Sequence, residues 1–370
     1  MKFKIKNKTF EKNLLSANSF INKANKLPTL SNALIEAKDN SIIITATDLV
    51  VEGIFTIKDN IEILEEGSIL TNTSKLLNII KLSDQDEVTL ETEGTSLILS
   101  DETSTYELYT YDSSNFSKFS VEDEQFNTFF IKKTILEKAL KETYFTVKTV
   151  ALKKYFTGIS IRKIESNIIL FSGTDNFRLS TSFIKTDTDI PFDLDILLPK
   201  RTAKQIITFL ENFEEENIEI KFSDKFLSIS MDNLTINSKL IEDKFPDITH
   251  IVNHEFPNYI EVNSSDFFKV FKKSAIFTND GNKSVVVNLE KSKMTLFSED
   301  SSSGRSKNIL PVTYEFEPIN FAIKPSHILE IENHFLSEKI IIRFENLDLP
   351  FLIEDSNNPN FKYFIQPTDI

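Results

Sequence analysis

The sequence predicts an α+β protein built from three similar repeats, each with two helices packed on antiparallel sheet. The first observation is a polar turn that places an aspartate after an apolar run, at Asp48, Asp175 and Asp300. These positions lie roughly 127 and 125 residues apart, which is too long for a solenoid period and typical of a domain. The other two observations are helical patterns that recur with the same spacing.

The first recurring pattern is a short alternating strand, then a polar residue, then an amphipathic helix. It begins at Phe3 in "FKIKNKTFEKNLLSAN", at Phe129 in "FFIKKTILEKALKET" and at Tyr259 in "YIEVNSSDFFKVFKKSA". Alternation with period two favours a strand, and apolar residues three to four positions apart favour a helix. In the third copy we expect Ser264 or Ser265 to be the N-cap.

The second recurring pattern is a strand that leads into an apolar helix of about three turns. Its copies are "GSILTNTSKLLNIIKLS", "DILLPKRTAKQIITFLENF" and "NFAIKPSHILEIENHFL". Alternating pairs such as "ALIEAKDNSIIITATD" and "EVTLETEGTSLILSD" carry Asp-Asn or Glu-Gly at the expected hairpin turns. Each repeat therefore reads βαββββαββ. We expect domains at 1–122, 123–253 and 254–370, with polar or proline-bearing linkers between them.

Composition excludes several functional classes. The chain has 370 residues and no cysteine, which excludes disulfides, thiolate metal sites and cysteine nucleophiles. It has only 7 glycines and neither a GxxxxGKS nor a GxGxxG pattern, so a glycine-rich phosphate loop is not expected. The basic N-terminus lacks a following apolar core, and no apolar run has the roughly 18 residues of a membrane span. We expect a cytoplasmic protein without membrane association.

Positive charge is concentrated on the predicted helices, although the net charge is −14. Acidic residues gather in strands and loops such as "EILEEGS" and "ENFEEENIEI". For a single helix a solvated basic face is the commoner explanation, but repetition in three repeats favours contact with DNA phosphates, without readout of base sequence. The candidate DNA-facing residues are Lys12, Lys23, Lys26, Lys75, Lys81, Lys138, Lys141, Lys200, Arg201, Lys204, Lys269, Lys272 and Lys273.

No catalytic constellation stands out. Asp175 is a candidate catalytic residue, metal ligand or turn residue. Because Asp48 and Asp300 occupy the same place in the sister repeats, we interpret it as a turn residue whose side chain accepts backbone N–H groups. The His-x-x-x-His spacing in "HIVNHE" lies between two prolines, which favours a linker over a metal site. We expect no metal, no cofactor and no enzymatic activity.

Several ordered motifs extend over the whole chain: "LPTLSNALIEAKDNSIIITATDLV" (27–50), "GTDNFRLS" (173–180), "LLPKRTAKQII" (197–207), "SKLIEDKFPDI" (238–248) and "YFIQP" (363–367). Together they resemble the bacterial sliding clamp family, the β subunit of DNA polymerase III. The resemblance implies three clamp domains per chain and a head-to-tail homodimeric ring around double-stranded DNA. It also implies a processivity factor that binds DNA polymerase and the clamp loader through short peptide motifs.

The resemblance further implies a partner-peptide pocket between the second and third domains. Thr174, Arg178 and Leu179 match the family's usual residue types. Asn176 and Phe177 stand where the family has Gly and His, so the chain is a divergent member with an altered pocket. The implied pocket residues are Tyr155, Phe156, Thr174, Asn176, Phe177, Arg178, Leu179, Pro246, His250, Ile251, Pro350, Phe364, Gln366 and Thr368.

Two further expectations follow from the resemblance. Asp243 replaces a family glycine in "IEDKFPD", which predicts a positive φ at an aspartate. The ring interface would pair an edge strand of the first domain with the third domain. Its matching apolar positions, for which core packing is an equal alternative, are Tyr106, Leu108, Ile276 and Phe277.

Two functions from different classes remain. The first is a clamp that encircles DNA and serves as a platform for other proteins. The alternative is a three-domain α+β enzyme or binding protein that acts on nucleic acid. The clamp requires a stable dimer of twice 42.5 kDa, which the alternative does not.

Overall fold

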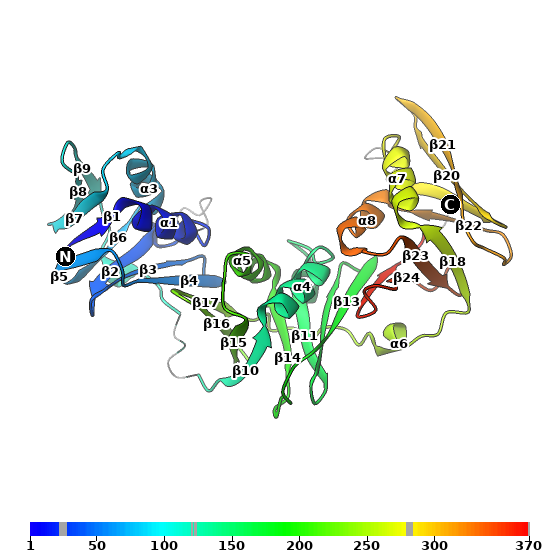
Figure 1. The fold of residues 1–370 in the computed structure, drawn as a ribbon, viewed down its shortest axis with the longest axis horizontal. Coiled ribbons are helices and arrows are strands. Elements are labelled where there is room, and N and C mark those ends of the chain that lie inside the picture. The colour runs from blue at the N-terminus through cyan, green and yellow to red at the C-terminus, as the bar shows by residue number, and fades with distance from the viewer. Residues whose placement is uncertain (22–27, 120, 122–123, 279–283, 369–370) are drawn as a thin grey trace. The chain divides into compact units, whose positions relative to one another are not determined.

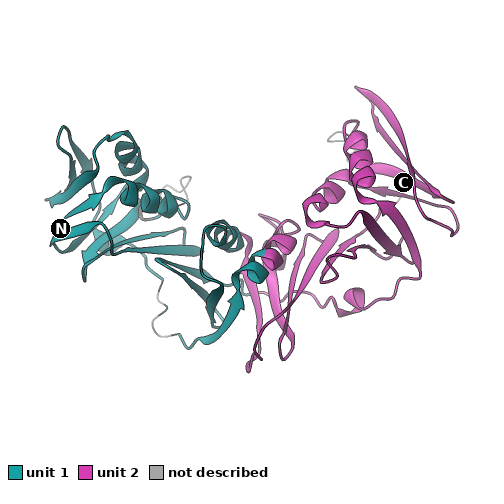
Figure 2. Ribbon diagram, viewed as in Figure 1, with its two compact units in different colours: residues 1–137, 201–242 teal, residues 138–200, 243–370 magenta. Residues whose placement is uncertain are grey.

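The computed structural model describes residues 1–21, 28–119, 121, 124–278 and 284–368. The chain forms two compact units (Figure 2). Unit 1 contains residues 1–137 and 201–242, and unit 2 contains residues 138–200 and 243–370. Each unit thus combines one terminal repeat with part of the middle repeat, because each large sheet continues from one repeat into the next.

The helices and strands follow a similar order in the three repeats (Figure 1). The first repeat contains β1 (Lys2–Lys6), α1 (Asn7–Asn18), α2 (Pro28–Ser31), β2 (Ala33–Lys38), β3 (Ser41–Thr47), β4 (Val51–Ile57), β5 (Ile61–Glu65), β6 (Gly67–Thr71), α3 (Thr73–Leu82), β7 (Glu87–Glu93), β8 (Ser96–Ser100) and β9 (Thr105–Tyr109). The second contains β10 (Asn127–Lys132), α4 (Lys133–Tyr144), β11 (Gly158–Glu165), β12 (Ile168–Thr174), β13 (Arg178–Lys185), β14 (Asp195–Pro199), α5 (Lys200–Leu210), β15 (Asn217–Phe222), β16 (Phe226–Met231) and β17 (Leu234–Lys239). The third follows α6 (Thr249–Val252) and contains β18 (Asn258–Asn263), α7 (Ser264–Ala275), β19 (Val285–Glu290), β20 (Lys293–Asp300), β21 (Gly304–Pro311), β22 (Ile319–Ile323), α8 (Pro325–Leu329), β23 (Lys339–Phe344), β24 (Phe351–Asp355) and β25 (Phe361–Ile365).

The expected order of elements needs two corrections. Three strands, not two, follow the second helix of each repeat, and the first repeat has the additional strand β5. The second helix of the third repeat is also shorter than the expected three turns. Pro325 begins α8, which ends at Leu329, and a 3₁₀ turn at Glu332–His334 follows. This break lets Ile331 and Phe335 both be buried in the core of unit 2.

The sheets are antiparallel and two of them join neighbouring repeats. In unit 1, β17 of the second repeat pairs with β4 of the first, which gives the order β10-β15-β16-β17-β4-β3-β2-β6. In unit 2, β25 of the third repeat pairs with β13 of the second, which gives β14-β11-β12-β13-β25-β24-β23-β18. Two smaller sheets, β5-β1-β7-β8-β9 and β21-β20-β19-β22, end at strands β9 and β21.

The helices bury one apolar face, as their sequence spacing requires. On α7, Phe267, Phe268 and Phe271 are almost fully buried, whereas Lys269, Lys272 and Lys273 are exposed. The N-cap of α7 is Asn263, whose side chain accepts the N–H of Asp266 at 3.0 Å. The expectation of Ser264 or Ser265 at this position was wrong, because β18 runs directly into the helix and leaves its last residue as the cap.

The tight turns use residues that tolerate a positive φ. Asp39 and Asn40 adopt φ values of 51° and 53° between β2 and β3, as the Asp-Asn pattern predicts. Asp243 is not among the described residues with positive φ, so that expectation was wrong. Asn176 instead has φ 84°, at the position where the related family has glycine. No helix in the described ranges is long and apolar enough to cross a membrane.

Candidate partner-binding pocket

The strand-end turn at Asp175 is held by its own side chain. Asp175 Oδ1 accepts the backbone N–H groups of Phe177 at 3.0 Å and Arg178 at 3.1 Å. Asp48 and Asp300 likewise accept backbone N–H groups two residues ahead of them. The interpretation of the recurring aspartate as a turn residue is therefore confirmed.

Arg178 lies behind this turn with a side chain that is only 8% exposed. Its Nε donates to Asp175 Oδ2 at 3.0 Å, and its Nη2 donates to the carbonyl of Phe145 at 3.2 Å. Its Nη1 lies 2.8 Å from Glu330 Oε2. Two carboxylates thus compensate one guanidinium that is removed from water, which fixes its orientation. Arg178 is a rigid part of the wall and not a free cation.

Two other neighbours of Arg178, His327 and Tyr363, are uncharged near neutral pH. Burial, together with the positive charge of Arg178, lowers the pKa of His327 to about 4. Burial raises the pKa of Tyr363 above its ordinary value, and Tyr363 Oη donates to the carbonyl of His327 at 2.9 Å. The sister histidine His334 stacks on Phe145 with ring centroids 4.9 Å apart, and burial also lowers its pKa to about 4.

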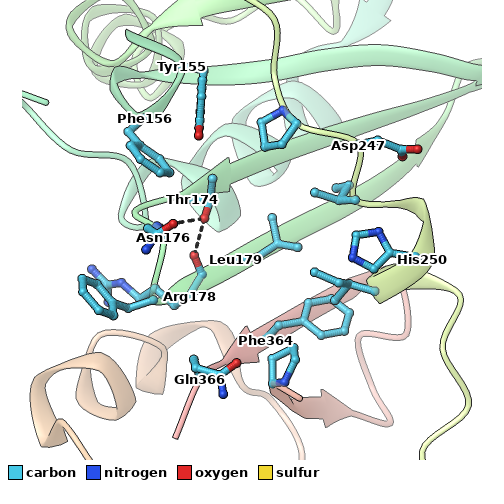
Figure 3. A pocket seen from close by; sticks show the side chains of 15 residues that line it. Tyr155, Phe156, Thr174, Asn176, Arg178, Leu179, Asp247, His250, Phe364 and Gln366 are labelled. Carbon is cyan, nitrogen blue, oxygen red and sulfur yellow. Dashed lines mark hydrogen bonds between the residues drawn. The ribbon is translucent and has the colours of Figure 1, made fainter. Parts of the chain in front are cut away.

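A pocket of about 280 Å³ opens in unit 2 over the joint between β13 and β25. The strand register places Leu179 opposite Phe364. Figure 3 shows Leu179 and Phe364 beside this space, with Tyr155 and Phe156 on one side of it. The pocket is lined by Tyr155, Phe156, Thr174, Asn176, Phe177, Arg178, Leu179, Pro246, Asp247, Ile248, His250, Ile251, Pro350, Phe364 and Gln366.

Backbone hydrogen bonds hold the walls of the pocket together. Asp243 Oδ2 accepts the N–H of Tyr155 at 3.1 Å, which ties the segment before Pro246 to the aromatic wall. Gln366 donates its N–H to the carbonyl of Phe177 at 2.8 Å. The contribution of Asp243 to the pocket is therefore this hydrogen bond from its carboxylate. The positive φ that the sequence predicted for Asp243 is not found.

The structure places every implied pocket residue on this lining except Thr368. Thr368 is exposed and pairs with Ala322, to which it donates an N–H at 2.9 Å. Sequence comparison missed Asp247 and Ile248, which lie between the implied residues Pro246 and His250 and contribute to the same wall. Their position between two implied pocket residues was the signal in the sequence that could have identified them. The segment itself contains the short helix α6, where an irregular linker was expected.

The equivalent joint in unit 1 uses the same register, displaced by 127 residues. It pairs Glu52 with Asn237, where unit 2 pairs Leu179 with Phe364. Glu52 is 2% exposed, and it accepts the N–H of Phe119 at 3.0 Å and the side-chain amide of Asn237 at 3.1 Å. Burial raises the pKa of Glu52.

Phe119 occupies the place in unit 1 that Pro246 occupies in unit 2, again 127 residues away. The Phe119 ring lies 6.0 Å from the Phe226 ring, and Lys239 Nζ lies 5.2 Å from the centroid of the Phe119 ring. Proline has no N–H to donate, so the corresponding bond cannot form in unit 2. The chain's own linker is therefore bonded to the sheet in unit 1, whereas the joint in unit 2 carries an apolar pocket.

The candidate DNA-facing residues fall into three sets. Lys23 and Lys26 lie outside the described residues. Lys12, Lys75, Lys81, Lys204, Lys269 and Lys273 are exposed. Those with contacts inside their own unit are Lys138 to Asn358, Lys141 near His334, Lys200 to the carbonyl of Val147, Arg201 to Asp48, and Lys272 to Glu332.

Lys200 shows how such a contact limits availability. Its Nζ donates to the carbonyl of Val147 and lies 4.9 Å from the centroid of the Tyr144 ring. Burial lowers its pKa. The ammonium group of Lys200 therefore interacts with the carbonyl of Val147 and the ring of Tyr144. It is less available than the ammonium group of an exposed lysine to contact a DNA phosphate.

The candidate interface residues lie on or near the ends of the two smaller sheets. Tyr106 is 39% exposed on β9 and Ile276 is 70% exposed just after α7. Phe277 is half-buried. Leu108 is buried at 7% exposure, so for this residue core packing is the correct alternative. Among the described residues no group of three or more His, Asp or Glu side chains is arranged to hold a metal ion.

This arrangement of repeats, in which strand pairs join one α+β unit to the next, defines a class of protein, the DNA clamp fold. Models of the DNA polymerase III beta subunit match three parts of the chain: the N-terminal domain at residues 1–120, the central domain at 130–247 and the C-terminal domain at 249–369. The chain therefore belongs to the DNA polymerase III beta subunit family.

Similar proteins cover the full length of the chain. A beta sliding clamp from Buchnera aphidicola subsp. Rhopalosiphum padi is 26% identical over 99% of both chains, and one from Vibrio cholerae is 23% identical over the same share. A solved DnaN sliding clamp from Bartonella birtlesii, bound to griselimycin, covers 100% of both chains with a TM-score of 0.94 and 22% identity. A solved clamp from Caulobacter crescentus has a TM-score of 0.93 and 21% identity.

Proposed function

We propose that the chain is a DNA polymerase processivity factor, a sliding clamp that encircles double-stranded DNA as a head-to-tail homodimer. It acts without catalysis in the cytoplasm, and it binds DNA polymerase and the clamp loader through short peptides. Its domains are residues 1–122, 123–253 and 254–370. Membership of the DNA polymerase III beta subunit family supports this proposal.

One observation carries the ring. Within the chain, the last strand of one repeat pairs with the strand that follows the aspartate turn of the preceding repeat, as β17 with β4 and β25 with β13. The last strand of the first repeat is β9, and the strand after the aspartate turn of the third repeat is β21. Both end their sheets. Pairing β9 with β21 of a second chain would repeat the same joint, and two such contacts close a ring.

The charges fit this function. The exposed lysines of the candidate helix surfaces contact phosphates weakly and without readout of base sequence, which keeps DNA mobile inside a ring. Because these helix surfaces are positive, the rest of the chain is more negative than the net charge of −14, which disfavours binding of DNA anywhere else. The apolar pocket of unit 2 suits one or two apolar side chains of a partner peptide.

Retention on circular DNA tests the proposal. Purified protein is loaded onto a nicked plasmid by its clamp loader, and the complex is separated by gel filtration in high salt. We expect protein to remain on circular plasmid and to be lost after the plasmid is cut once, because a ring leaves only through a free end. Equal loss from circular and linear plasmid in high salt would show that binding is electrostatic and not topological.

A further inference from the structure

The strand that follows each aspartate turn has one position that can be matched in all three repeats. This position pairs across the hairpin with the residue just before the aspartate, and its occupants are Glu52, Leu179 and Arg305. Within the chain, Glu52 and Leu179 each meet the last strand of the following repeat. Arg305 is therefore the equivalent residue on β21, which ends its sheet.

The last strand of each repeat has a matching position too. Cross-strand pairs lead from the residue five positions before α1, α4 or α7, through two intermediate strands, to the last strand of the same repeat. The residues reached in this way are Glu107, Asn237 and Phe364. Asn237 pairs with Glu52, and Phe364 pairs with Leu179. The same register between two chains places Glu107 opposite Arg305.

The faces of the two strands agree with this register. On β21, the side chain of Asn308 donates to Ser274 Oγ of α7 at 3.1 Å, so Arg305, an odd number of residues away, points to the opposite face. On β9, Leu108 is buried, so its neighbour Glu107 also points away from the core. Directly opposed residues share a face, whereas a shift by one residue would place Leu108 opposite Arg305.

Neither charged group has an ionic partner in its own chain. Arg305 is exposed and forms no ion pair with a described carboxylate, including Glu299, its cross-strand neighbour on β20. Glu107 is exposed and forms no ion pair with a described basic side chain. Ser96 Oγ donates to Glu107 Oε1 at 2.6 Å, which orients this carboxylate. Both groups are therefore available to a second chain.

The two strands also differ in the sign of their charge. Residues 101–112, which contain β9, include four acidic residues and no Lys or Arg. Residues 304–311, which form β21, include Arg305 and Lys307 and no Asp or Glu. A contact between two β9 strands or two β21 strands would bring like charges together, whereas a contact between β9 and β21 brings opposite charges together.

We propose that Glu107 of one chain and Arg305 of the other form an ion pair at both contacts of the ring. This inference rests on the proposed homodimer and specifies the residues that fix its strand register and its head-to-tail direction. The position that carries an apolar pair in the β13–β25 joint and a hydrogen-bonded pair in the β4–β17 joint carries a charged pair between chains.

Reversal of either charge tests this inference. Glu107→Arg places two arginines opposite each other at both contacts, and Arg305→Glu places two glutamates there. We expect each variant to raise the dissociation constant of the dimer about 100-fold, or about tenfold for each of the two contacts. Sedimentation equilibrium of the full chain at low salt measures the constant, and the effect should shrink as sodium chloride is raised.

Mixing the two variants provides the decisive measurement. In a heterodimer of Glu107→Arg and Arg305→Glu, each contact again joins one arginine to one glutamate. We expect the equimolar mixture to dimerise with a constant close to the wild-type value, and native mass spectrometry should identify the heterodimer. Glu62→Arg is the matched control, because β5 lies at the opposite edge of the same sheet, and it should keep the wild-type constant.

The outcomes separate failure of the ion pair from failure of the ring. A wild-type chain that is monomeric at every concentration would overturn both. A wild-type dimer whose constant neither variant changes would overturn the ion pair and leave the ring. Two weakened variants that stay monomeric when mixed would also overturn the ion pair, because damage to the fold of each chain is not repaired by mixing.

Discussion

His334 stacks on Phe145 at the margin of the core of unit 2, and burial of its ring makes the stability of the protein depend on pH. Its pKa is about 4 in the folded chain, against 6.5 in the unfolded chain, chiefly because of burial and secondarily because of Lys141. The unfolded chain therefore binds a proton first as pH falls. Stability contributed by the neutral ring is complete above pH 6.5 and is lost as pH falls from 6.5 towards 4.

Replacement of His334 by Phe should remove this dependence while the aromatic stack is kept. We expect the difference in unfolding free energy between His334→Phe and wild type to change by about 3 kcal/mol in favour of the variant between pH 7 and pH 4. Urea unfolding at several pH values measures it. His334→Gln should show the same change with pH but lower stability at pH 7, because it lacks the ring. A parallel pH profile for wild type and both variants would contradict the assignment.

Arg178 illustrates what a residue type alone does not decide. Its match to the related family predicts a pocket residue, and the chain places it there. Whether its charge is available to a ligand depends on Asp175, Glu330 and the carbonyl of Phe145, which come from three different segments. Lys324 and Lys148 carried no such signal in the sequence, yet their ammonium groups lie over the Phe177 ring beside this pocket.

At the scale of elements, two strand pairs with the same register differ in the side chains that they present. The β13–β25 joint carries apolar side chains and is open, whereas the β4–β17 joint carries Glu52 and Asn237 and is bonded to Phe119. The repeat spacing predicted the recurring aspartate turn that precedes β4 and β13. The difference between the two joints depends on which long-range partner meets each strand.

Glu52→Ala tests the bonded joint in unit 1. The substitution leaves the N–H of Phe119 and the amide of Asn237 without their acceptor in a buried site. We expect a loss of about 2 to 3 kcal/mol in unfolding free energy, measured by urea denaturation of the chain. Glu62→Ala is the control, because the Glu62–Lys4 ion pair is largely exposed, and it should change stability by less than about 1 kcal/mol. Similar losses in the two variants would contradict the role of Glu52.

At the scale of the whole molecule, the ends of the two smaller sheets are where we propose that two chains meet. Ile276 is 70% exposed after α7 and lies among the implied interface positions. In a ring, a carboxylate at this position would be removed from water without a partner. We therefore expect Ile276→Asp to convert a dimer of twice 42.5 kDa into a 42.5 kDa monomer, measured by sedimentation equilibrium. Val150→Asp, at an 85% exposed position, should remain a dimer. A dimeric Ile276→Asp variant would remove this residue from the interface.

Most of the fold could be predicted from the sequence because it depends on local patterns. Periodicities of two and about 3.6 mark strands and helices, and the recurrence of Asp48, Asp175 and Asp300 marks the three repeats. Two predictions about helix ends were wrong. The N-cap of α7 is Asn263 and not Ser264. Helix α8 ends earlier than predicted, and Ile331 and Phe335 after it are both buried in the core.

The sequence by itself determined the number of repeats, the family, and the residue types of the pocket wall, because these follow from spacing and motif. Only the tertiary structure decided that Thr368 lies away from the pocket, that Leu108 is core, and that lysines from two distant segments meet at Phe177. The tertiary structure also decided that the β13–β25 pair carries a pocket, whereas the β4–β17 pair is bonded to Phe119. Each of these depends on strand register and on contacts between residues far apart in the chain, which no local pattern records.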